Sequence, residues 1–307
     1  MNISEKLKII KDFSSLTQEK LAKELEVSFA TLNSWINGRS IPHKRKQVQI
    51  DELYAKYSGT KIIPETVLAA KKDLLNKKSR KYKNILATII DSPDIYDRFV
   101  LSLTYNTNRI EGSTLTEDET AAILFENASL PNRNITEQLE AKNHQTVFNF
   151  MFDWLKSKKP ISEELIMKLH SILMNSIRSD AGVYRSHGVR IMGTNVPTAN
   201  YLKVPVLMKG LVKDINARKK DFIGKLADIH SRFEQIHPFS DGNGRIGRLL
   251  IHAMLLQKNF PPALILQKEK RLYMKYLNKS QMTGDKSLLE DFLCDAVLLS
   301  FDLMERR

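Results

Sequence analysis

Apolar residues recur at spacings of three and four along most of this 307-residue chain. This is the period of an α-helix with one buried face, and it occurs without internal repeats or Gly/Ser-rich tracts. Hydrophobic residues make up 42% of the chain, enough for a core in each of about two domains. The sequence therefore predicts an all-α protein and excludes a disordered chain.

Positive charge is concentrated near the N-terminus. Lys and Arg total 48 against 35 Asp and Glu, and residues 1–90 alone contain 18 basic and 9 acidic side chains. A surplus of this size favours a polyanion as partner, such as nucleic acid, a nucleotide or a membrane headgroup. Charge alone does not choose among them.

The lack of a cysteine pair and of a long apolar stretch indicates the cellular compartment of the protein. Cys294 is the only cysteine, so the chain cannot form an internal disulfide or a cysteine-based zinc site. No stretch approaches the roughly 18 apolar residues of a membrane span, and the first residues mix charged with apolar side chains. We therefore expect a cytoplasmic protein without a membrane segment.

The helical pattern breaks near Ser58-Gly59, and this break suggests how the chain is divided. Residues 1–58 are predicted to form a small basic domain. Residues 59–90 are predicted to form a basic helical linker, and residues 91–307 a larger helical domain.

Residues 16–42 have the pattern of two short helices joined by the tight Glu26-Val27 turn. Thr17 and Ser28 are residue types that cap helix N-termini. The second helix must cross the first steeply, which leaves its outer face free.

That outer face is suited to reading DNA bases. Asn33 can pair with an adenine edge, and Phe29 and Ala30 can contact a thymine methyl group. The side chains suited to neutralising phosphates are Lys23, Arg39, Lys44, Arg45 and Lys46.

Residues 3–57 resemble the helix-turn-helix of the phage-repressor (XRE) family, through Gln18 and a WxNGxxxP ending at Trp35, Asn37, Gly38 and Pro42. The resemblance implies a DNA-binding homodimer with Gln18 among the contact residues. The family usually has Gly where this chain has Glu26, which must then adopt a left-handed backbone at a cost of about 1 kcal/mol. The alternative is a helical module that binds protein or dimerises.

The most informative segment is HPFSDGNGRIGR, residues 237–248, which lies between two apolar helical stripes. A loop at a helix N-terminus offers free N–H groups and the positive end of the helix dipole, and Gly242 and Gly244 permit close approach of a phosphate. Arg245 and Arg248 share one face of the first helical turn, where they can hold phosphate oxygens.

Two further residues complete a site for phosphate chemistry. Asp241 supplies the oxygen ligand that Mg²⁺ prefers when it is otherwise bound by phosphates and water. His237 is suited to act as a general base for an attacking hydroxyl. The chain has no GxxxxGK[ST] and no protein-kinase signature, which weakens the ATPase and kinase hypotheses.

The segment matches the Fic motif HPFx[DE]GNGRxxR at every defined position, and residues 91–307 resemble the Fic family. The resemblance implies a Fic-type helical domain and a protein adenylyltransferase. Such a nucleotidyltransferase moves AMP from ATP to a Ser, Thr or Tyr hydroxyl of a protein target, possibly itself, and releases pyrophosphate.

The resemblance also implies roles for the motif residues. The base is His237, the Mg²⁺ ligand is Asp241, and the nucleotide-binding residues are Gly242, Asn243, Gly244, Arg245 and Arg248. In that arrangement Asn243 and the glycine amides surround the α-phosphate, and the two arginines contact the β- and γ-phosphates. Related Doc proteins, which transfer phosphate, have Lys at the position of Gly244, so Gly244 favours nucleotidyl transfer.

Residues 94–112 are predicted to form an apolar helix that ends at Gly112. Its end, TNRIEG, resembles the inhibitory [ST]xxxE[GN] motif of many Fic proteins, in which the Glu pairs with the second motif arginine. The resemblance implies that Glu111 binds Arg248 and restrains the enzyme. Two alternatives are that Glu111 is only a surface carboxylate, or that it positions a water for removal of AMP from modified protein.

The segment 182–205 predicts a short β-hairpin, from the alternation of Val189 and Ile191 and the Gly-Thr-Asn turn at 193–195. Gly182, Tyr184 and Arg185 resemble the GxYR lead-in of Fic proteins, in which such a flap lies over the site and pairs with the target backbone. A surface hairpin without this role is the alternative.

A function of another class stays open. The protein can be a DNA-binding transcriptional regulator whose Fic domain senses nucleotide or modifies the regulator itself. The two functions predict different losses. Replacing His237 by Ala should abolish transfer and leave DNA affinity intact, whereas changing Asn33 or Lys44 should weaken DNA binding and leave transfer unchanged.

Overall fold

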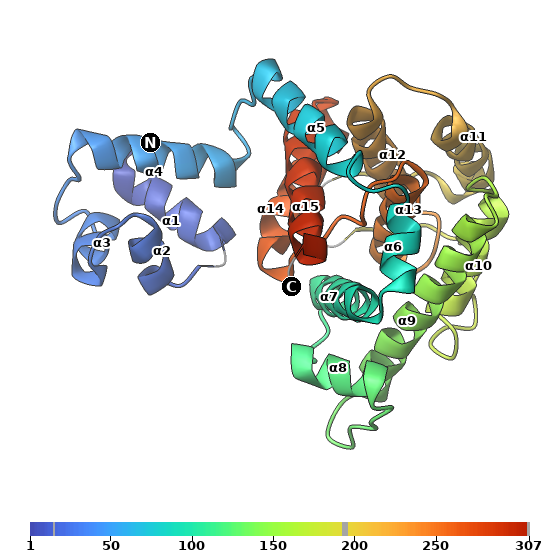
Figure 1. The fold of residues 1–307 in the computed structure, drawn as a ribbon. Coiled ribbons are helices and arrows are strands. Elements are labelled where there is room, and N and C mark those ends of the chain that lie inside the picture. The colour runs from blue at the N-terminus through green and yellow to red at the C-terminus, as the bar shows by residue number, and fades with distance from the viewer. Residues whose placement is uncertain (15, 192–195, 306–307) are drawn as a thin grey trace.

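The computed structural model describes residues 1–14, 16–191 and 196–305, and every regular element in that part of the chain is helical. This confirms the all-α prediction. The chain forms a small N-terminal lobe and a large lobe that meet at a narrow neck (Figure 1). None of the described helices has the length and apolarity needed to cross a membrane.

The small lobe is a bundle of four helices, in which α1 packs against α3 and α4, and α2 packs against α3. The elements are α1 (Ile3–Ser14), α2 (Gln18–Glu24), α3 (Phe29–Ile36) and α4 (Lys44–Ser58). The side chains of Thr17 and Ser28 accept hydrogen bonds from the backbone N–H groups of Lys20 and Thr31, so both predicted N-caps are confirmed. The core of the lobe contains the fully buried Leu7, Ile10, Leu21, Leu32 and Ile50.

The turn between α2 and α3 has the predicted left-handed residue. Glu26 has a φ of 52°, and the Lys46 ammonium donates a 2.6 Å hydrogen bond to the Leu25 carbonyl beneath it. Lys46 is also 3.4 Å from the Glu26 carboxylate and is only 8% exposed. The prediction that Lys46 neutralises phosphates was therefore wrong, because this lysine holds a turn carbonyl that has no helical partner.

The large lobe is built around α13, which packs against α7, α9, α10 and α12. Nearly all side chains of α13 are buried, so its first turn is fixed in the middle of the lobe. The α-helices are α5 (Glu65–Ser79), α6 (Ile85–Asp91), α7 (Pro93–Glu111), α8 (Glu117–Phe125), α9 (Ile135–Lys156), α10 (Glu163–Leu173), α11 (Val204–Asn216), α12 (Phe222–Ile236), α13 (Asn243–Gln257), α14 (Lys270–Thr283) and α15 (Ser287–Glu305). Two 3₁₀ helices are η1 (Tyr201–Lys203) and η2 (Gln267–Glu269).

The segment 59–90 is docked on the large lobe. α5 lies along α15, where Lys71 contacts Asp291 at 2.5 Å and Lys72 contacts Glu290 at 2.5 Å (Figure 1). Part of the basic excess of residues 1–90 is therefore neutralised within the fold.

The predicted flap differs from the expectation. The described residues on both sides of the turn, 182–191 and 196–200, contain no strand, and the Gly-Thr-Asn turn itself lies outside the described residues. The Thr198 hydroxyl donates a 2.7 Å hydrogen bond to the Val189 carbonyl, which joins the two sides. The short Val189/Ile191 alternation thus corresponds to a segment without regular secondary structure.

The neck is formed by a few contacts between α1 and α14 and by the end of α4. α4 stops at Ser58 because Gly59 takes the left-handed conformation, with a φ of 72°, at the predicted break. The Tyr276 hydroxyl on α14 donates a 3.0 Å hydrogen bond to the Lys56 carbonyl. The small lobe therefore touches the large lobe mainly through α14.

Candidate active site

The Fic-like segment forms a tight loop between α12 and α13. His237 ends α12 in the left-handed conformation, with a φ of 50°, and Gly242 caps α13 with a φ of 76°. A Cβ at Gly242 would stand 2.9 Å from the Met174 sulfur, so only glycine fits there without displacement. The loop brings the N-terminus of α13 to the cleft beside His237. The N–H groups of the first helical turn have no partner within the helix and can face a ligand.

Asn243 gives the loop its shape. Its side-chain amide donates to the Phe239 carbonyl at 2.8 Å, and its side-chain oxygen accepts from the Phe239 N–H at 2.9 Å. The side chain is therefore engaged within the loop, and the backbone N–H of Asn243 is the group that remains to face an anion.

His170 supports the same loop from α10. Its Nδ1 accepts a 2.7 Å hydrogen bond from the Gly182 N–H, so the proton lies on Nε2, which donates to the Asp241 carbonyl at 3.1 Å. The ring stacks on Phe239 at 3.7 Å, and burial lowers the pKa of His170 to about 4. Sequence reasoning assigned no site role to His170, since its distance along the chain from the motif gave no signal.

Arg185, the last residue of the GxYR-like lead-in, clamps the loop from the other side. Its guanidinium donates to the carbonyls of His237 at 2.7 Å, Ile236 at 3.3 Å and Ala199 at 2.5 Å. Its backbone N–H donates to the Pro238 carbonyl at 3.0 Å. Only 4% of the residue is exposed, and it fixes the described segments 182–191 and 196–200 against the loop.

His237 is half-buried and lines the cleft. Its Nδ1 lies 3.2 Å from the Glu234 carbonyl, which can accept only if Nδ1 carries the proton. In that tautomer Nε2 has a free lone pair, and among the described residues it has no hydrogen-bond partner. Burial lowers the pKa of His237, against the opposing effect of the Glu234 carbonyl, so the ring is neutral at pH 7 and able to accept a proton.

Glu111 and Arg248 are brought together, although they are far apart in the sequence. The Arg248 guanidinium donates to Glu111 Oε1 at 2.5 Å and to the Thr107 hydroxyl at 2.7 Å. Burial acts to raise the pKa of Glu111, but the attraction of Arg248 outweighs it and holds that pKa below its ordinary value. The carboxylate is thus ionised, and within the cleft lining it forms an ion pair with the Arg248 guanidinium.

Gly244 makes this contact possible. A Cβ at Gly244 would stand 2.5 Å from Glu111 Oε1 and 3.2 Å from an Arg248 nitrogen. The pair can take this position over the first turn of α13 without a clash because Gly244 has no side chain.

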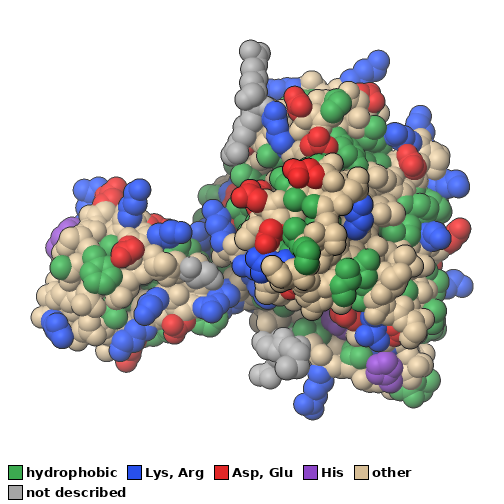
Figure 2. Space-filling view, turned by 90° about the horizontal axis from the view of Figure 1, so that it is seen from below, with side chains coloured by type: hydrophobic (Ala, Val, Ile, Leu, Met, Phe, Trp, Pro, Cys, Tyr) green, Lys and Arg blue, Asp and Glu red, His purple; other side chains and the backbone are tan. Residues whose placement is uncertain are grey.

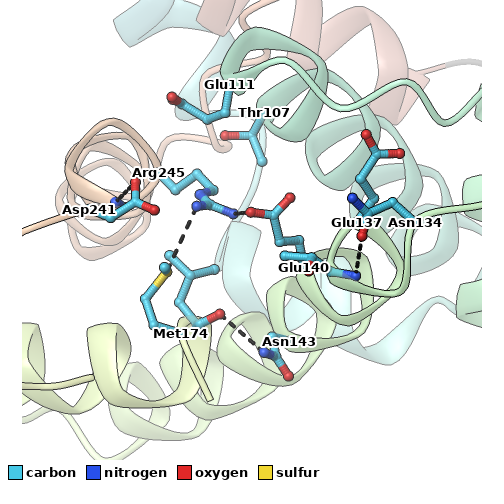
Figure 3. Close-up of polar contacts among 12 residues, drawn as sticks. Thr107, Glu111, Asn134, Glu137, Glu140, Asn143, Met174, Asp241 and Arg245 are labelled. Carbon is cyan, nitrogen blue, oxygen red and sulfur yellow. Dashed lines mark hydrogen bonds and ion pairs between the residues drawn. The ribbon is translucent and has the colours of Figure 1, made fainter. Parts of the chain in front are cut away.

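Arg245 points away from the cleft. Its guanidinium donates to Glu140 on α9 at 2.6 Å and lies 3.8 Å from the Met174 sulfur (Figure 3). The residue is 2% exposed and is not among those that line the cleft. The structure therefore does not bring Arg245 together with His237 and Arg248, and it shows an ion pair with Glu140 that sequence reasoning missed.

The cleft itself has a volume of about 370 Å³. Asp241 is exposed at its edge, and the Asp241 Oδ1 accepts a 2.6 Å hydrogen bond from the Gly242 N–H. Residues of α14 form a wall that sequence reasoning missed. The lining residues outside the motif are Ile110, Glu111, Arg190, Ile191, Glu234, Lys270, Tyr273, Met274 and Leu277.

Glu234 is a buried acid in this cleft. It is 6% exposed, and its Oε1 has no hydrogen-bond partner in the part of the chain that the structure describes. Burial raises its pKa to about 8, although Arg248 lowers it. No group of three acidic, His or Cys side chains suited to a metal ion occurs among the described residues. A metal ion here would therefore depend on a ligand's phosphates for most of its coordination.

Comparison with known proteins agrees with this geometry. Residues 160–255 match the Fic/DOC family, and residues 14–54 match a helix-turn-helix family. The chain carries a Fic domain. Its N-terminal lobe is a helix-turn-helix domain of the XRE type.

Two relatives of the Fic domain are curated as protein adenylyltransferases. The protein from Nematostella vectensis is 31% identical over 188 residues, covering 57% of this chain and 42% of the relative. The protein from Caenorhabditis briggsae is 31% identical over 186 residues, covering 59% of this chain and 36% of the relative. The chain thus spans less than half of the length of these relatives.

Solved structures show the same fold. Residues 134–508 of Fic-1 from C. elegans align with 94% of this chain and 84% of that chain, with a TM-score of 0.67 and 21% identity. A Fic-domain signalling protein from Bacteroides thetaiotaomicron aligns with 76% of this chain and 98% of its own, with a TM-score of 0.65 and 23% identity. These similarities establish the Fic fold of the large lobe.

Proposed function

We propose that the Fic domain is a protein adenylyltransferase that transfers AMP from ATP to a hydroxyl of a protein target. The observation that carries the proposal is the position of His237, whose free Nε2 shares one cleft with the N-terminus of α13 and with Arg248. The names of the curated relatives support the same activity.

The triphosphate is expected to lie along the first turn of α13. The backbone N–H groups of Gly244 and its neighbours, together with the helix dipole, provide the anion site for the α-phosphate. Arg248 and Lys270, both in the cleft wall, are placed to hold the outer phosphates. Arg245 supports this turn indirectly, because its pairing with Glu140 anchors α13 to α9.

Asp241 fits a magnesium site of the kind that shares its ion with a substrate. A single exposed carboxylate at the cleft edge is enough when phosphates and water supply the other ligands. A bound Mg²⁺ would neutralise part of the phosphate charge. The apolar end of the cleft, formed by Tyr273, Met274 and Leu277, is suited to the base of the nucleotide.

In the transfer step, His237 Nε2 takes the proton from the target hydroxyl as its oxygen forms a bond to the α-phosphorus. The bond from the α-phosphorus to the bridging oxygen breaks, and pyrophosphate leaves. The Glu234 carbonyl, through Nδ1–H, keeps the imidazole in the tautomer that can accept this proton.

Glu111 is proposed to restrain this reaction. Its carboxylate neutralises Arg248, which the outer phosphates need as a partner. A well-placed pair of this kind is worth ~1–3 kcal/mol of coupling, or several-fold to about a hundredfold in turnover. The ion pair between Glu111 and Arg248 in the structure supports this proposal.

The experiment that tests the proposal identifies which phosphorus reaches protein. Glu111→Gly protein is incubated with cell lysate and ATP labelled at the α- or the γ-phosphate. We expect the α-label on protein and the γ-label in pyrophosphate. Protein labelled only from the γ-position would show phosphate transfer and overturn the proposal, while loss of label from a target modified beforehand would indicate AMP removal.

DNA binding by the small lobe is a second proposal, carried by the exposed outer face of α3. Phe29 is 47% exposed, and Ala30 lies beside it in solvent. The Asn33 side-chain oxygen accepts a 2.9 Å hydrogen bond from Asn37, which it must release to pair with a base. Gln18 and Lys44 are the first residues of α2 and α4, where they can contact the DNA backbone of one half-site. In a homodimer, the second subunit would contact the second half-site.

Lys44→Ala should weaken binding to duplex DNA at all sequences alike and should reduce the slope of log affinity against log salt by about 0.9, the share of one phosphate contact. Fluorescence anisotropy at several salt concentrations measures both effects. Lys168→Ala, at an exposed position on α10, is the matched control. Equal slopes for wild type and Lys44→Ala would contradict the proposed contact.

A further inference from the structure

A second cavity lies at the neck between the two lobes. Its volume is about 790 Å³, within the range of small-molecule sites, which often form where domains meet. It is bounded by the end of α1, by Ser58 and Gly59, and by one side of α14. The residues that line it from α14 are Lys270, Arg271, Met274, Lys275, Asn278, Lys279 and Met282.

The wall of the neck cavity combines apolar surface with positive charge. Phe13 and Met282 are 38% and 62% exposed there, which is high for large apolar side chains. Four basic residues and one acid, Asp12, are also in the lining. Among the described residues, Lys279 is the only one of the four basic side chains with an ion pair, with Asp285 at 3.0 Å. Figure 2 shows Lys and Arg side chains gathered beside the neck.

Lys275 is the most informative of these residues. Its ammonium lies 4.0 Å from the centre of the Phe13 ring, and it faces no carboxylate within ion-pair distance in the described part of the chain. Its side chain is half-buried, and burial lowers its pKa. A desolvated cation without a counter-charge is costly, and the ring offsets only part of that cost.

Several half-buried lysines elsewhere in the large lobe have carboxylate partners. Lys71 and Lys72 on α5 each contact two carboxylates, and Lys78 contacts Glu305 at 3.0 Å. Lys142 and Lys225 have no carboxylate partner, but each donates hydrogen bonds to backbone carbonyls. Lys275 differs from these lysines because, in the described part of the chain, its ammonium has neither a carboxylate nor a carbonyl acceptor.

We propose that the neck cavity binds a small aromatic anion, whose acidic group pairs with Lys275 and whose ring packs between Phe13 and Met274. Charge complementarity selects an anion, and the exposed apolar wall selects a ligand with an apolar body. Lys270 and Met274 line both this cavity and the active cleft, so a bound ligand touches two residues of the cleft wall. The site is thus placed where an effector of the Fic domain or of the helix-turn-helix domain would act.

The probe for the test is 8-anilinonaphthalene-1-sulfonate, an aromatic anion that becomes fluorescent in apolar sites. Titration of the full chain should give one saturable site, and Lys275→Glu should weaken it about tenfold or more, as expected for reversal of a close charge. Lys83→Glu, which changes a lysine in a separate cavity of about 650 Å³ between α6 and α9, should bind as wild type does. Lys275 lines the neck cavity and does not line the active cleft. Weaker binding by Lys275→Glu would therefore show that the probe binds in the neck cavity.

Two competitors separate charge from apolar contact. 2-Naphthoate should displace the probe, and the neutral 2-naphthalenemethanol should displace it at least tenfold less well. Lys275→Gln, checked by its melting temperature, replaces Lys275→Glu if that variant fails to fold. Wild-type affinity in the Lys275 variant, the same loss in Lys83→Glu, or equal competition by the two naphthalenes would each overturn the proposal.

Discussion

His237→Ala should lower the rate of AMP transfer by about 10²–10⁴-fold, the usual contribution of a general base. The structure gives the physical reason. The imidazole is neutral, its Nδ1–H is held by the Glu234 carbonyl, and Nε2 opens into the cleft without a partner among the described residues. Alanine leaves the loop clamps of Arg185 and His170 in place, so ATP affinity should change little.

Initial rates with α-labelled ATP, measured in the Glu111→Gly background, test this expectation. His187→Ala, an exposed histidine near the same loop, is the matched control. The pH profile gives a second check, because burial lowers the His237 pKa below 6.5. The base then stays neutral and active as the pH falls through 6.5, and the rate should drop only at lower pH. A His237→Ala enzyme with wild-type rates would refute the assignment.

Glu111→Gly should raise the rate of AMP transfer by several-fold to about a hundredfold. Removal of the carboxylate frees Arg248, which remains fixed by its bond to the Thr107 hydroxyl and stays available to a phosphate. The affinity for ATP should rise with the rate, since the lost carboxylate carried a negative charge beside the phosphate site. Time courses of labelling and equilibrium binding of ATP measure the two effects.

The control series separates charge from size. Glu111→Gln keeps the side chain but removes its charge, so it should be activated as well, though less than Glu111→Gly. Glu164→Gln, an exposed acid on α10, should behave as wild type does. If Glu111→Gly labels itself and its targets no faster than wild type, Glu111 does not restrain the enzyme.

Local patterns allowed much of the site to be predicted from the sequence. The helical period, the caps of α2 and α3 and the left-handed Glu26 depend on neighbouring residues, and each is present in the structure. The motif segment 237–248 predicted the loop before α13, and a second short motif predicted that Glu111 lies beside Arg248.

Contacts between distant segments could not be predicted in this way. The partner of Arg245 is Glu140, on another helix, and the wall formed by Tyr273 belongs to a helix well beyond the motif. Only packing of α13 among its neighbours brings these groups together. Lys46 is a second example. Its place next to Arg45 in the sequence gave no sign that its ammonium would be buried and hydrogen-bonded to a turn carbonyl.

Gly244 bears on both the proposed phosphate site and the proposed restraint by Glu111, because it has no side chain. A Cβ there would stand 2.5 Å from Glu111 Oε1, so a side chain at this position would force the carboxylate to shift from its place beside Arg248. We expect lysine at 244, the residue of the phosphate-transferring Doc proteins, to disturb the proposed restraint by Glu111 as well. The residue at position 244 would thus bear on both the proposed reaction and its proposed restraint.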